Sequence, residues 1–559
     1  MSERSSPRRW IVLAAALILL HAALGLWSIT THSATFDEPA HIASGRVFWE
    51  RGQAVDTFHA PLPQLWAALP LLGLDLKVPY DTQEYRGRFM YAFGERLLYY
   101  SGNDADRLLR RARAMNLLLS LALAAVLWSW TRRRWGEAPA ACALALYACS
   151  PSILAHATVA MTDMPAVFFM TLSILAFLSF LERPGRRPAL AAAAAAAAAL
   201  LCKFSALVLW PLFAAALVGE FLRDRRKGAE TAACFARWAC LPGLAAAVLY
   251  FVFYPPAAAG FIQRLTMVTG GEHPTFLLGR TSRTGWLAYY PVALLAKSTL
   301  VELAVLGAAL WTLRRRAEAP PSVRVALLAA GLLLAVVAKS HIQVGARYIL
   351  LIYPLLALAA APLAARLIAR TPRAMTILLA GGLLQAAAAF IAMPHFIAFF
   401  NQAAGGPANG YRILVDSNLD WGQELKALGA AHRRAGRPEV VLAYFGTASA
   451  EYHGVLAQQL KATAAIARRH RNSDRPRAEW LVVSATFLSG AYVGRETFAW
   501  LRGREPLMVL GHSLFVYDIT RDGAAHRRLA ELYAAEGDPA LAARERIRAE
   551  LIAAEEAKG

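Results

Sequence analysis

Charged residues are scarce in this chain, at 17% of its 559 residues. A typical soluble domain carries about 25%. Hydrophobic residues supply 57% of the sequence, and the mean hydropathy is +0.39. This composition excludes a disordered protein, a fibrous protein and an ordinary cytosolic enzyme, and it predicts a polytopic α-helical membrane protein.

Cysteine is also rare, and each cysteine lies inside an apolar run or at its edge: Cys142, Cys149, Cys202, Cys234 and Cys240. The long polar regions contain none, so no disulfide framework holds them together. The chain has no CxxC and no HExxH motif. This argues against a structural zinc site encoded by one local motif.

Acidic residues are outnumbered, with 38 against 59 lysines and arginines and a net charge of +21. In a soluble chain this excess would indicate nucleic-acid binding. Here the basic residues form short clusters between apolar runs, a pattern typical of topology signals in membrane proteins. We therefore expect the lipid bilayer, and no nucleic acid, as a partner.

Long apolar runs are the main feature that is present, and a membrane-spanning helix needs about 20 such residues. Eleven candidate spans lie at 10–29, 112–131, 138–156, 163–181, 188–202, 204–222, 233–254, 286–312, 323–340, 348–368 and 374–393. The first is interpreted as uncleaved, because Ser33-Ala34-Thr35 after it is a poor signal-peptidase site. Basic clusters occupy every second connection, which predicts a cytoplasmic N-terminus and an external C-terminal region.

Three parts are expected along the chain. Residues 1–393 form a transmembrane domain with long external loops at 30–111 and 255–285, residues 394–524 form an external α/β domain, and residues 525–559 form a helical hairpin. The α/β prediction rests on strand-like stretches at 439–446, 480–488 and 507–519. Helical patterns at 421–435 and 455–470 separate them.

Two acidic motifs flank predicted spans on the same side of the membrane. Thr35-Phe36-Asp37-Glu38-Pro39-Ala40-His41 follows the first span, and Thr162-Asp163-Met164-Pro165 precedes the fourth. Each has a simpler interpretation as a helix start, with a capping carboxylate near a first-turn proline. Their shared side nevertheless predicts that Asp37 and Asp163 meet in one cavity.

Cationic and aromatic residues lie near the same predicted face, and each has an alternative as a snorkelling or interface residue. They are Lys203, Arg280, Arg283, Lys297, His341, Arg347 and Tyr348. Lys297 lies inside a predicted span, and an intramembrane lysine is a functional candidate by default. Carboxylates beside several cations suit the chemistry of a phosphate-bearing lipid. In the tail, polar groups beside Trp421 suit a sugar-binding surface, although Asp420 is equally explained as a helix cap.

These motifs together resemble the bacterial relatives of the protein O-mannosyltransferases and of the aminoarabinose–lipid A transferase, which are membrane glycosyltransferases of the C-type (GT-C) fold. The resemblance runs from about 35 to 426. Its motifs are Asp37-Glu38-x2-His41, His59-Ala60-Pro61-Leu62, Thr162-Asp163-Met164-Pro165, GWLAYYPVALLAKS at 285–298, ARYILLIYP at 346–354 and NGYRILVDSNLDWGQELK at 409–426. Ala60 departs from the pattern, because many relatives have a second proline there.

The resemblance implies a multi-pass enzyme of the bacterial cytoplasmic (inner) membrane that uses a polyprenyl-phosphate sugar. Asp37 would be the general base for an acceptor hydroxyl, and Glu38 and Asp163 would orient the acceptor or the base. The implied substrate-binding residues are His41, His59, Lys203, Arg280, Lys297, His341, Arg347 and Tyr348. Of these, Lys203, Arg280 and Arg347 would contact the lipid phosphate, and the reaction would invert the anomeric centre.

Two other functions fit a membrane protein of this composition. A transporter or lipid flippase would show paired halves with broken helices near the midplane, and the sequence shows no such pairing. A scaffold whose tail recruits partners would leave the acidic motifs unexplained. The sequence leaves open the sugar, the acceptor (protein, lipid or glycan), the prenol length and a divalent cation held by Asp37, Glu38 and Asp163.

Overall fold

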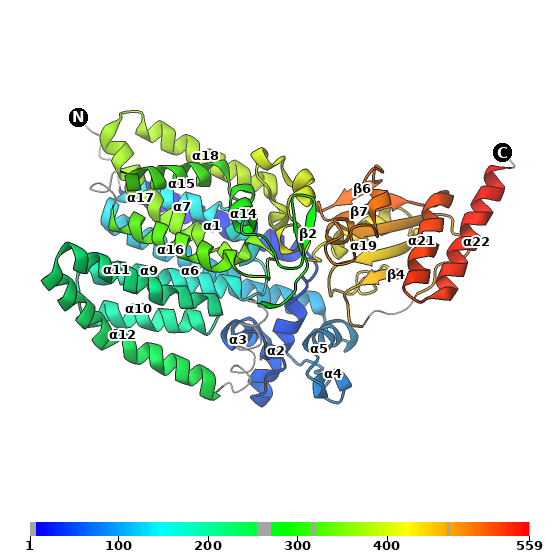
Figure 1. The fold of residues 1–559 in the computed structure, drawn as a ribbon, viewed down its shortest axis with the longest axis horizontal. Coiled ribbons are helices and arrows are strands. Elements are labelled where there is room, and N and C mark those ends of the chain that lie inside the picture. The colour runs from blue at the N-terminus through cyan, green and yellow to red at the C-terminus, as the bar shows by residue number, and fades with distance from the viewer. Residues whose placement is uncertain (1–6, 254–269, 315–319, 467–469, 558–559) are drawn as a thin grey trace.

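The computed structural model describes residues 7–253, 270–314, 320–466 and 470–557. Long helices form a bundle at one end, and a five-stranded sheet lies at the other end (Figure 1). The bundle contains α1 (Pro7–Thr31), α6 (Ala105–Trp135), α7 (Glu137–Ala148), α8 (Pro151–Ala157), α9 (Asp163–Glu182), α10 (Arg186–Leu200), α11 (Leu209–Arg223), α12 (Arg225–Phe253), α14 (Tyr289–Lys297), α15 (Leu300–Arg314), α16 (Pro321–Ala338), α17 (Ile352–Arg370) and α18 (Ala374–Ala392). The chain is therefore a polytopic helical membrane protein with a small C-terminal α/β part.

Fewer helices than predicted are long enough to cross a bilayer. Within the described ranges seven helices pass a test of length and hydropathy, or eight if α7 and α8, bent by 58°, count as one span. The predicted number of eleven is thus not confirmed. At 15 residues, α10 is only about 22 Å long, against a hydrocarbon core of about 30 Å.

The predicted span 286–312 is divided into α14 and α15. Thr299 and Glu302 explain the division, because the Thr299 amide donates to Glu302 Oε2 (2.7 Å) and the Glu302 amide donates to Thr299 Oγ1 (3.1 Å). This reciprocal pair is a capping box, which starts a new helix. Residues 254–269 of the predicted seventh span and of the loop 255–285 lie outside the described residues.

Short helices from the predicted loop 30–111 cover the end of the bundle beside the sheet (Figure 1). They are α2 (Glu38–Arg51), α3 (Pro61–Ala68), α4 (Gln83–Arg86) and α5 (Met90–Glu95). Small residues let α2 pack closely on both sides. A Cβ added at Gly45 would lie 2.0 Å from the Gln64 carbonyl oxygen in α3, and one added at Gly94 of α5 would lie 2.4 Å from the Pro39 carbonyl carbon.

The sheet has the strand order β4-β3-β5-β7-β6. Its strands are β3 (Glu439–Tyr444), β4 (Ala457–Ala462), β5 (Glu479–Ser484), β6 (Met508–Leu510) and β7 (Leu514–Asp518). The strands β4, β3 and β5 are parallel, and β7 is antiparallel to both β5 and β6. The helix α19 (Leu425–Arg434) precedes β3. A separate hairpin pairs β1 (Thr275–Leu277) with β2 (Arg280–Ser282).

The predicted helix over 455–470 is wrong in its described part, because 457–462 form the strand β4. Pairing along β3 supplies main-chain hydrogen bonds to this segment. The Gln458 amide also donates to Tyr533 Oη (2.9 Å) and Glu545 Oε1 (3.0 Å), and both partners come from distant helices. These tertiary contacts override the helical preference of the local sequence.

The two charged helices predicted near the C-terminus are α21 (Gly523–Ala535) and α22 (Pro539–Glu556). They lie side by side at the outer end of the α/β part (Figure 1). A buried ionic network joins them to the sheet, because Arg544 contacts Glu479 of β5 (3.0 Å) and His526 contacts Glu545 (2.6 Å). The hairpin is therefore attached to the sheet and is not an independent arm.

Candidate active site

Asp37 lies at the start of α2, where the bundle meets the α/β part. Its Oδ1 accepts a hydrogen bond from Tyr91 Oη of α5 (3.1 Å). Its Oδ2 lies 3.7 Å from Arg347 Nη1, and 12% of the Asp37 side chain is exposed. The carboxylate therefore has a fixed orientation and one edge accessible to another molecule.

Asp163 lies at the start of α9, and its carboxylate is fully buried. Lys203 Nζ donates to its Oδ1 at 2.5 Å, and Arg347 Nη1 lies 4.0 Å from its Oδ2. The same Arg347 nitrogen is thus near both aspartates. The structure brings the two acidic motifs together, with Arg347 between the two aspartates and Lys203 beside Asp163.

Arg347 follows a loop that the tail holds in place. The Ala346 amide donates to Asn418 Oδ1 (2.9 Å), and Ser417 Oγ donates to the Val344 carbonyl (2.7 Å). The Arg347 guanidinium lies 4.6 Å from the centre of the Trp421 ring. Burial lowers its pKa, but Tyr348 and the two aspartates raise the pKa to a greater extent, so Arg347 is a permanent cation.

Two interpretations of the tail motif are corrected. Trp421 is only 1% exposed, so its ring cannot form a sugar-binding surface. Asp420 does not cap a helix of its own segment, because its Oδ2 accepts from the Thr486 amide (2.9 Å) in the first turn of the short helix Ala485–Leu488, which follows β5. The motif instead shapes the loop that carries Arg347.

The tail also holds the first acidic motif through main-chain hydrogen bonds. The Ser33 amide donates to the Gln423 carbonyl (3.0 Å), and the Phe36 amide donates to the Trp421 carbonyl (2.9 Å). Thr447 Oγ1 donates to the Phe36 carbonyl (2.6 Å). The α/β part therefore contributes to the position of Asp37.

Glu38 points away from Asp37 into the protein. Its carboxylate pairs with Arg113 of α6, at 2.6 Å from Nη2 and 2.8 Å from Nε. The amides of Thr35 and Ala160 each donate to it at 2.8 Å. Burial raises the pKa of Glu38, yet Arg113 and these amides bring it below the ordinary value. Ala160 precedes the second acidic motif, so Glu38 connects the two motifs.

His41 and His59 lie on either side of Asp56. His41 Nδ1 is 3.6 Å and His59 Nδ1 is 2.8 Å from Asp56 Oδ2. Asp56 Oδ2 also accepts from the Gln64 amide (2.7 Å). Burial and the neighbouring His59 lower the pKa of His41 to about 4, so His41 is neutral beside the site.

Three other predicted residues lie in different surroundings. The Lys297 ammonium donates to the carbonyls of Ile397, Phe399 and Asn418, and it thereby ties α14 to the tail. His341 Nδ1 lies 3.0 Å from the Gly271 carbonyl. Arg280 is exposed on β2, and no hydrogen bond or ion pair joins it to Asp37 or Asp163 within the described residues.

Two residues of the site, Tyr91 and Arg113, were not predicted from the sequence. No sequence pattern indicated Tyr91, because Tyr91 and Asp37 are far apart in the sequence and no helical or strand periodicity links them. Arg113 could have been predicted, since an arginine within a predicted span needs a buried partner. That requirement is met by Glu38.

The arrangement can deprotonate a hydroxyl beside a bound anion. A carboxylate such as that of Asp37 can accept a proton, and Arg347 and Lys203 provide positive charge within the same site. The three acidic residues do not share a position for a divalent cation, because Glu38 faces Arg113 and Asp163 faces Lys203. Protein cations occupy the positions that a metal ion's charge would otherwise fill.

Comparisons with known proteins agree with this fold. The sequence profile described as dolichyl-phosphate-mannose-protein mannosyltransferase matches residues 106–253. The crystal structure of ArnT from Cupriavidus metallidurans bound to undecaprenyl phosphate aligns with 91% of this chain and 98% of its own, at 15% identity and a TM-score of 0.50. The apo structure of the same protein aligns with 92% and 98%, at 15% identity and a TM-score of 0.49. No curated protein sequence matches.

The profile match and the match to the lipid-bound ArnT structure confirm the predicted resemblance to mannosyltransferase-like and ArnT-like proteins of the GT-C fold. At 15% identity, the structural match concerns the fold. The chemistry is therefore argued from the residues of this chain.

Proposed function

We propose that this protein transfers a glycosyl group from a polyprenyl-phosphate sugar to a hydroxyl acceptor. The observation that carries the proposal is the position of Arg347 between Asp37 and Asp163, with Lys203 beside them. A base and a phosphate-binding pair of cations thus lie in one site. The family profile names a prenyl-phosphate sugar donor, and the ArnT structure of this fold holds undecaprenyl phosphate, which supports a lipid phosphate as the leaving group.

In the proposed reaction Asp37 accepts the proton of the acceptor hydroxyl. The hydroxyl oxygen attacks the anomeric carbon of the sugar, and the bond from that carbon to the phosphate oxygen breaks. Polyprenyl phosphate leaves with the bonding electrons, and the attack inverts the anomeric centre. Arg347 and Lys203 stabilise the charge that develops on the phosphate.

The other residues of the site have positioning parts in this proposal. Tyr91 orients the Asp37 carboxylate, and Glu38 with Arg113 fixes the start of α2 relative to the second acidic motif. Asp163 holds Lys203 and Arg347 together. His41, whose amide donates to the Asp37 carbonyl (3.1 Å), and His59, whose ring lies 4.6 Å from that of His41, are candidates for contact with the acceptor or the sugar, as are Tyr348 and Arg280.

The decisive experiment compares envelope products of cells that contain the wild-type protein, Asp37→Asn or Asp81→Asn. Asp81 is an exposed carboxylate of the same region, so its variant is the matched control. Mass spectrometry of lipids, glycans and proteins should detect an added sugar with the wild type and with Asp81→Asn. The Asp37→Asn product should fall about 10²–10⁴-fold, the usual contribution of a general base. Undiminished product from Asp37→Asn at normal protein abundance would refute the proposal.

A transporter or lipid flippase remains the alternative function. Purified protein in liposomes distinguishes the two, because a transferase releases polyprenyl phosphate from the donor while a flippase moves the intact donor between leaflets. We expect release of polyprenyl phosphate by the wild type. Movement of donor without release would favour the alternative.

We further propose that the protein lies in the cytoplasmic (inner) membrane with the α/β part outside the cytoplasm. The alternation of basic clusters supports this orientation. A reporter fused after the last residue should be active only outside the cytoplasm. A cytoplasmic signal would place Asp37 on the opposite face and contradict the proposed orientation.

A further inference from the structure

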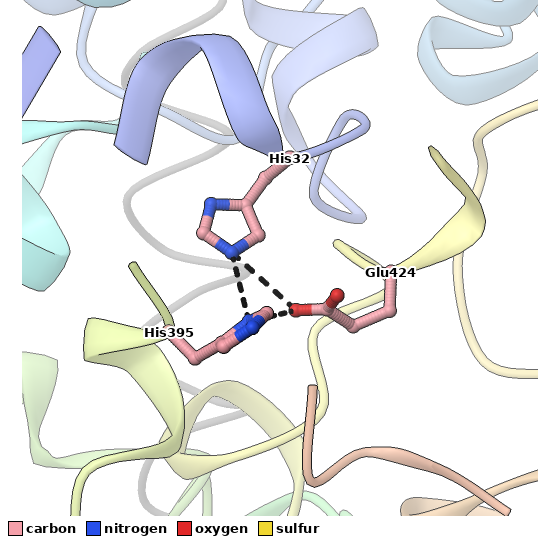
Figure 2. A group of neighbouring side chains, drawn as sticks. All are labelled: His32, His395 and Glu424. Atoms are coloured by element: carbon pink, nitrogen blue, oxygen red, sulfur yellow. Dashed lines mark hydrogen bonds and ion pairs between the residues drawn. The ribbon is translucent and has the colours of Figure 1, made fainter. Parts of the chain in front are cut away.

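A second cluster of ionisable side chains lies where the bundle joins the α/β part, and it has no part in the proposed reaction. His32 follows α1, His395 follows α18, and Glu424 precedes α19. Figure 2 shows the three side chains pointing toward one another from these separate segments. His32 Nε2 is 3.2 Å from His395 Nδ1 and 3.4 Å from Glu424 Oε1. His395 Nδ1 is 2.9 Å from Glu424 Oε1.

Two of these distances, 3.2 and 3.4 Å, are close to the edges of a metal coordination sphere, and the 2.9 Å separation of His395 Nδ1 from Glu424 Oε1 is a hydrogen-bond length. Around a tetrahedral zinc ion, ligand atoms at about 2.0–2.1 Å from the metal lie roughly 3.3–3.4 Å from one another. Each residue contributes one ligand atom, and the three atoms lie within 4.8 Å of one another, as three corners of such a tetrahedron would. Two imidazoles and one carboxylate are also a ligand set that suits zinc.

The surroundings of His32 orient its ring as they would for a metal ligand. Its Nδ1 lies 3.0 Å from the Ser28 carbonyl, which can only accept, so Nδ1 carries the hydrogen. Nε2 then has a free lone pair, and it faces His395 and Glu424. A metal-bound histidine usually donates its other N–H to a carbonyl or carboxylate in this way.

The cluster is enclosed on one side and accessible on the other. The turn between β6 and β7 closes over Glu424, because a Cβ added at Gly511 would lie 2.0 Å from the Glu424 carboxyl carbon. Gly511 also has a φ of +53°, which favours glycine. The His395 side chain is 27% exposed, which gives an ion a path to the ligands.

We infer that His32, His395 and Glu424 bind a divalent transition-metal ion of the zinc type, which clamps the ends of α1 and α18 to the start of α19. The inference is independent of the proposed glycosyl transfer. Without a metal, the same atoms could form a hydrogen-bonded triad in which His395 Nδ1–H faces two acceptors. The two arrangements differ in one measurable property, because only the metal site responds to zinc.

The test uses the full-length chain, purified in detergent with a tag that contains no histidine. The variants His395→Asn and Glu424→Gln keep a hydrogen-bonding group at each position but remove a good metal ligand. His470→Gln is the matched control, because His470 lies elsewhere on the α/β part. Zinc content is measured by inductively coupled plasma mass spectrometry, and Tm is measured in chelator and after zinc is added back.

We expect about one zinc ion per chain in the wild type and in His470→Gln. The Tm of both should rise on adding zinc after chelation. In His395→Asn and Glu424→Gln, the affinity for zinc should fall by more than about 100-fold. Loss of a residue that only supports a metal ligand costs up to about that much, and these variants lose a ligand itself. Their Tm in chelator should equal that of chelated wild type, which shows that they fold. Equal zinc binding by wild type and these variants, or no response of wild-type Tm to zinc, would overturn the inference in favour of the hydrogen-bonded triad.

Discussion

Arg347 Nη1 lies 3.7 Å from Asp37 Oδ2, although the two residues come from opposite halves of the sequence. This pair puts the proposed base beside a permanently charged guanidinium. An anion that entered the site would compete with Asp37 for the guanidinium. Donor binding would therefore loosen Arg347 from Asp37 at the moment when the carboxylate is needed as a proton acceptor.

The cations should affect donor binding more than any exposed arginine does. In Arg347→Gln or Lys203→Gln a charged hydrogen bond to the phosphate is lost, which costs about 1.5–3 kcal/mol of donor binding. Arg223→Gln is the control, because Arg223 lies at the end of α11 far from Lys203. Donor affinity of the purified protein is the measurement. Unchanged donor affinity in both site variants would show that neither residue binds the phosphate.

Tyr91→Phe should slow the transfer step without weakening donor binding. The substitution removes the hydrogen bond that orients Asp37, and such a bond to a charged group contributes about 1.5–3 kcal/mol, or about 10–150-fold. The rate at saturating donor should fall accordingly while KM for the donor stays constant. Tyr85→Phe removes a hydroxyl that bonds to Gln53 and serves as the control. A raised KM with an unchanged rate would instead place Tyr91 in donor binding.

Arg113→Leu should destabilise the whole protein. It leaves Glu38 as a fully buried carboxylate without its cation, and breaking a buried ion pair in this way costs about 3–5 kcal/mol. The double variant Glu38→Leu/Arg113→Leu removes both charges and should recover part of the loss. Thermal unfolding in detergent measures both. A wild-type Tm in the single variant would show that the amides of Thr35 and Ala160 suffice for Glu38 without its cation.

The stability of the α/β part should depend on Asp420. Burial raises the pKa of this carboxyl from 3.8 to about 7, so the folded state holds its proton more tightly than the unfolded chain. The stabilisation is complete below pH 3.8. It is lost as the pH rises to about 7, by up to ~1.4 kcal/mol per pH unit. Wild-type Tm should therefore fall across this window relative to Asp420→Asn. Parallel pH profiles would contradict the assignment.

Features that depend on neighbours in sequence were predictable, and features that depend on distant contacts were not. The apolar runs located most bundle helices, and the acidic motifs located Asp37 and Asp163. The break between α14 and α15 could also have been predicted, since Thr299 and Glu302 have the spacing of a capping box. The continuous apolar run around them led to the prediction of one long span instead.

The errors follow from contacts between distant segments. The strand β4 exists because β3 lies beside it, and nothing in its own sequence encodes that partner. The polar residues beside Trp421 are typical of a sugar-binding motif, but the Arg347 guanidinium lies over the Trp421 ring. The Lys297 ammonium, predicted to bind substrate, donates to three main-chain carbonyls from later in the chain, and its sequence neighbours did not reveal these partners. A single sequence does not reveal which segments meet.

The main-chain bonds from Ser33 and Phe36 to Gln423 and Trp421 have a consequence for biosynthesis. The segment that carries Asp37 enters the membrane early in translation, but its partners are made after the last bundle helix. The segment that carries Asp37 consequently lacks these two bonds while the ribosome is still extending the chain. If the proposed transfer depends on them, a half-made polypeptide would leave the cell's lipid-linked sugar to the finished protein.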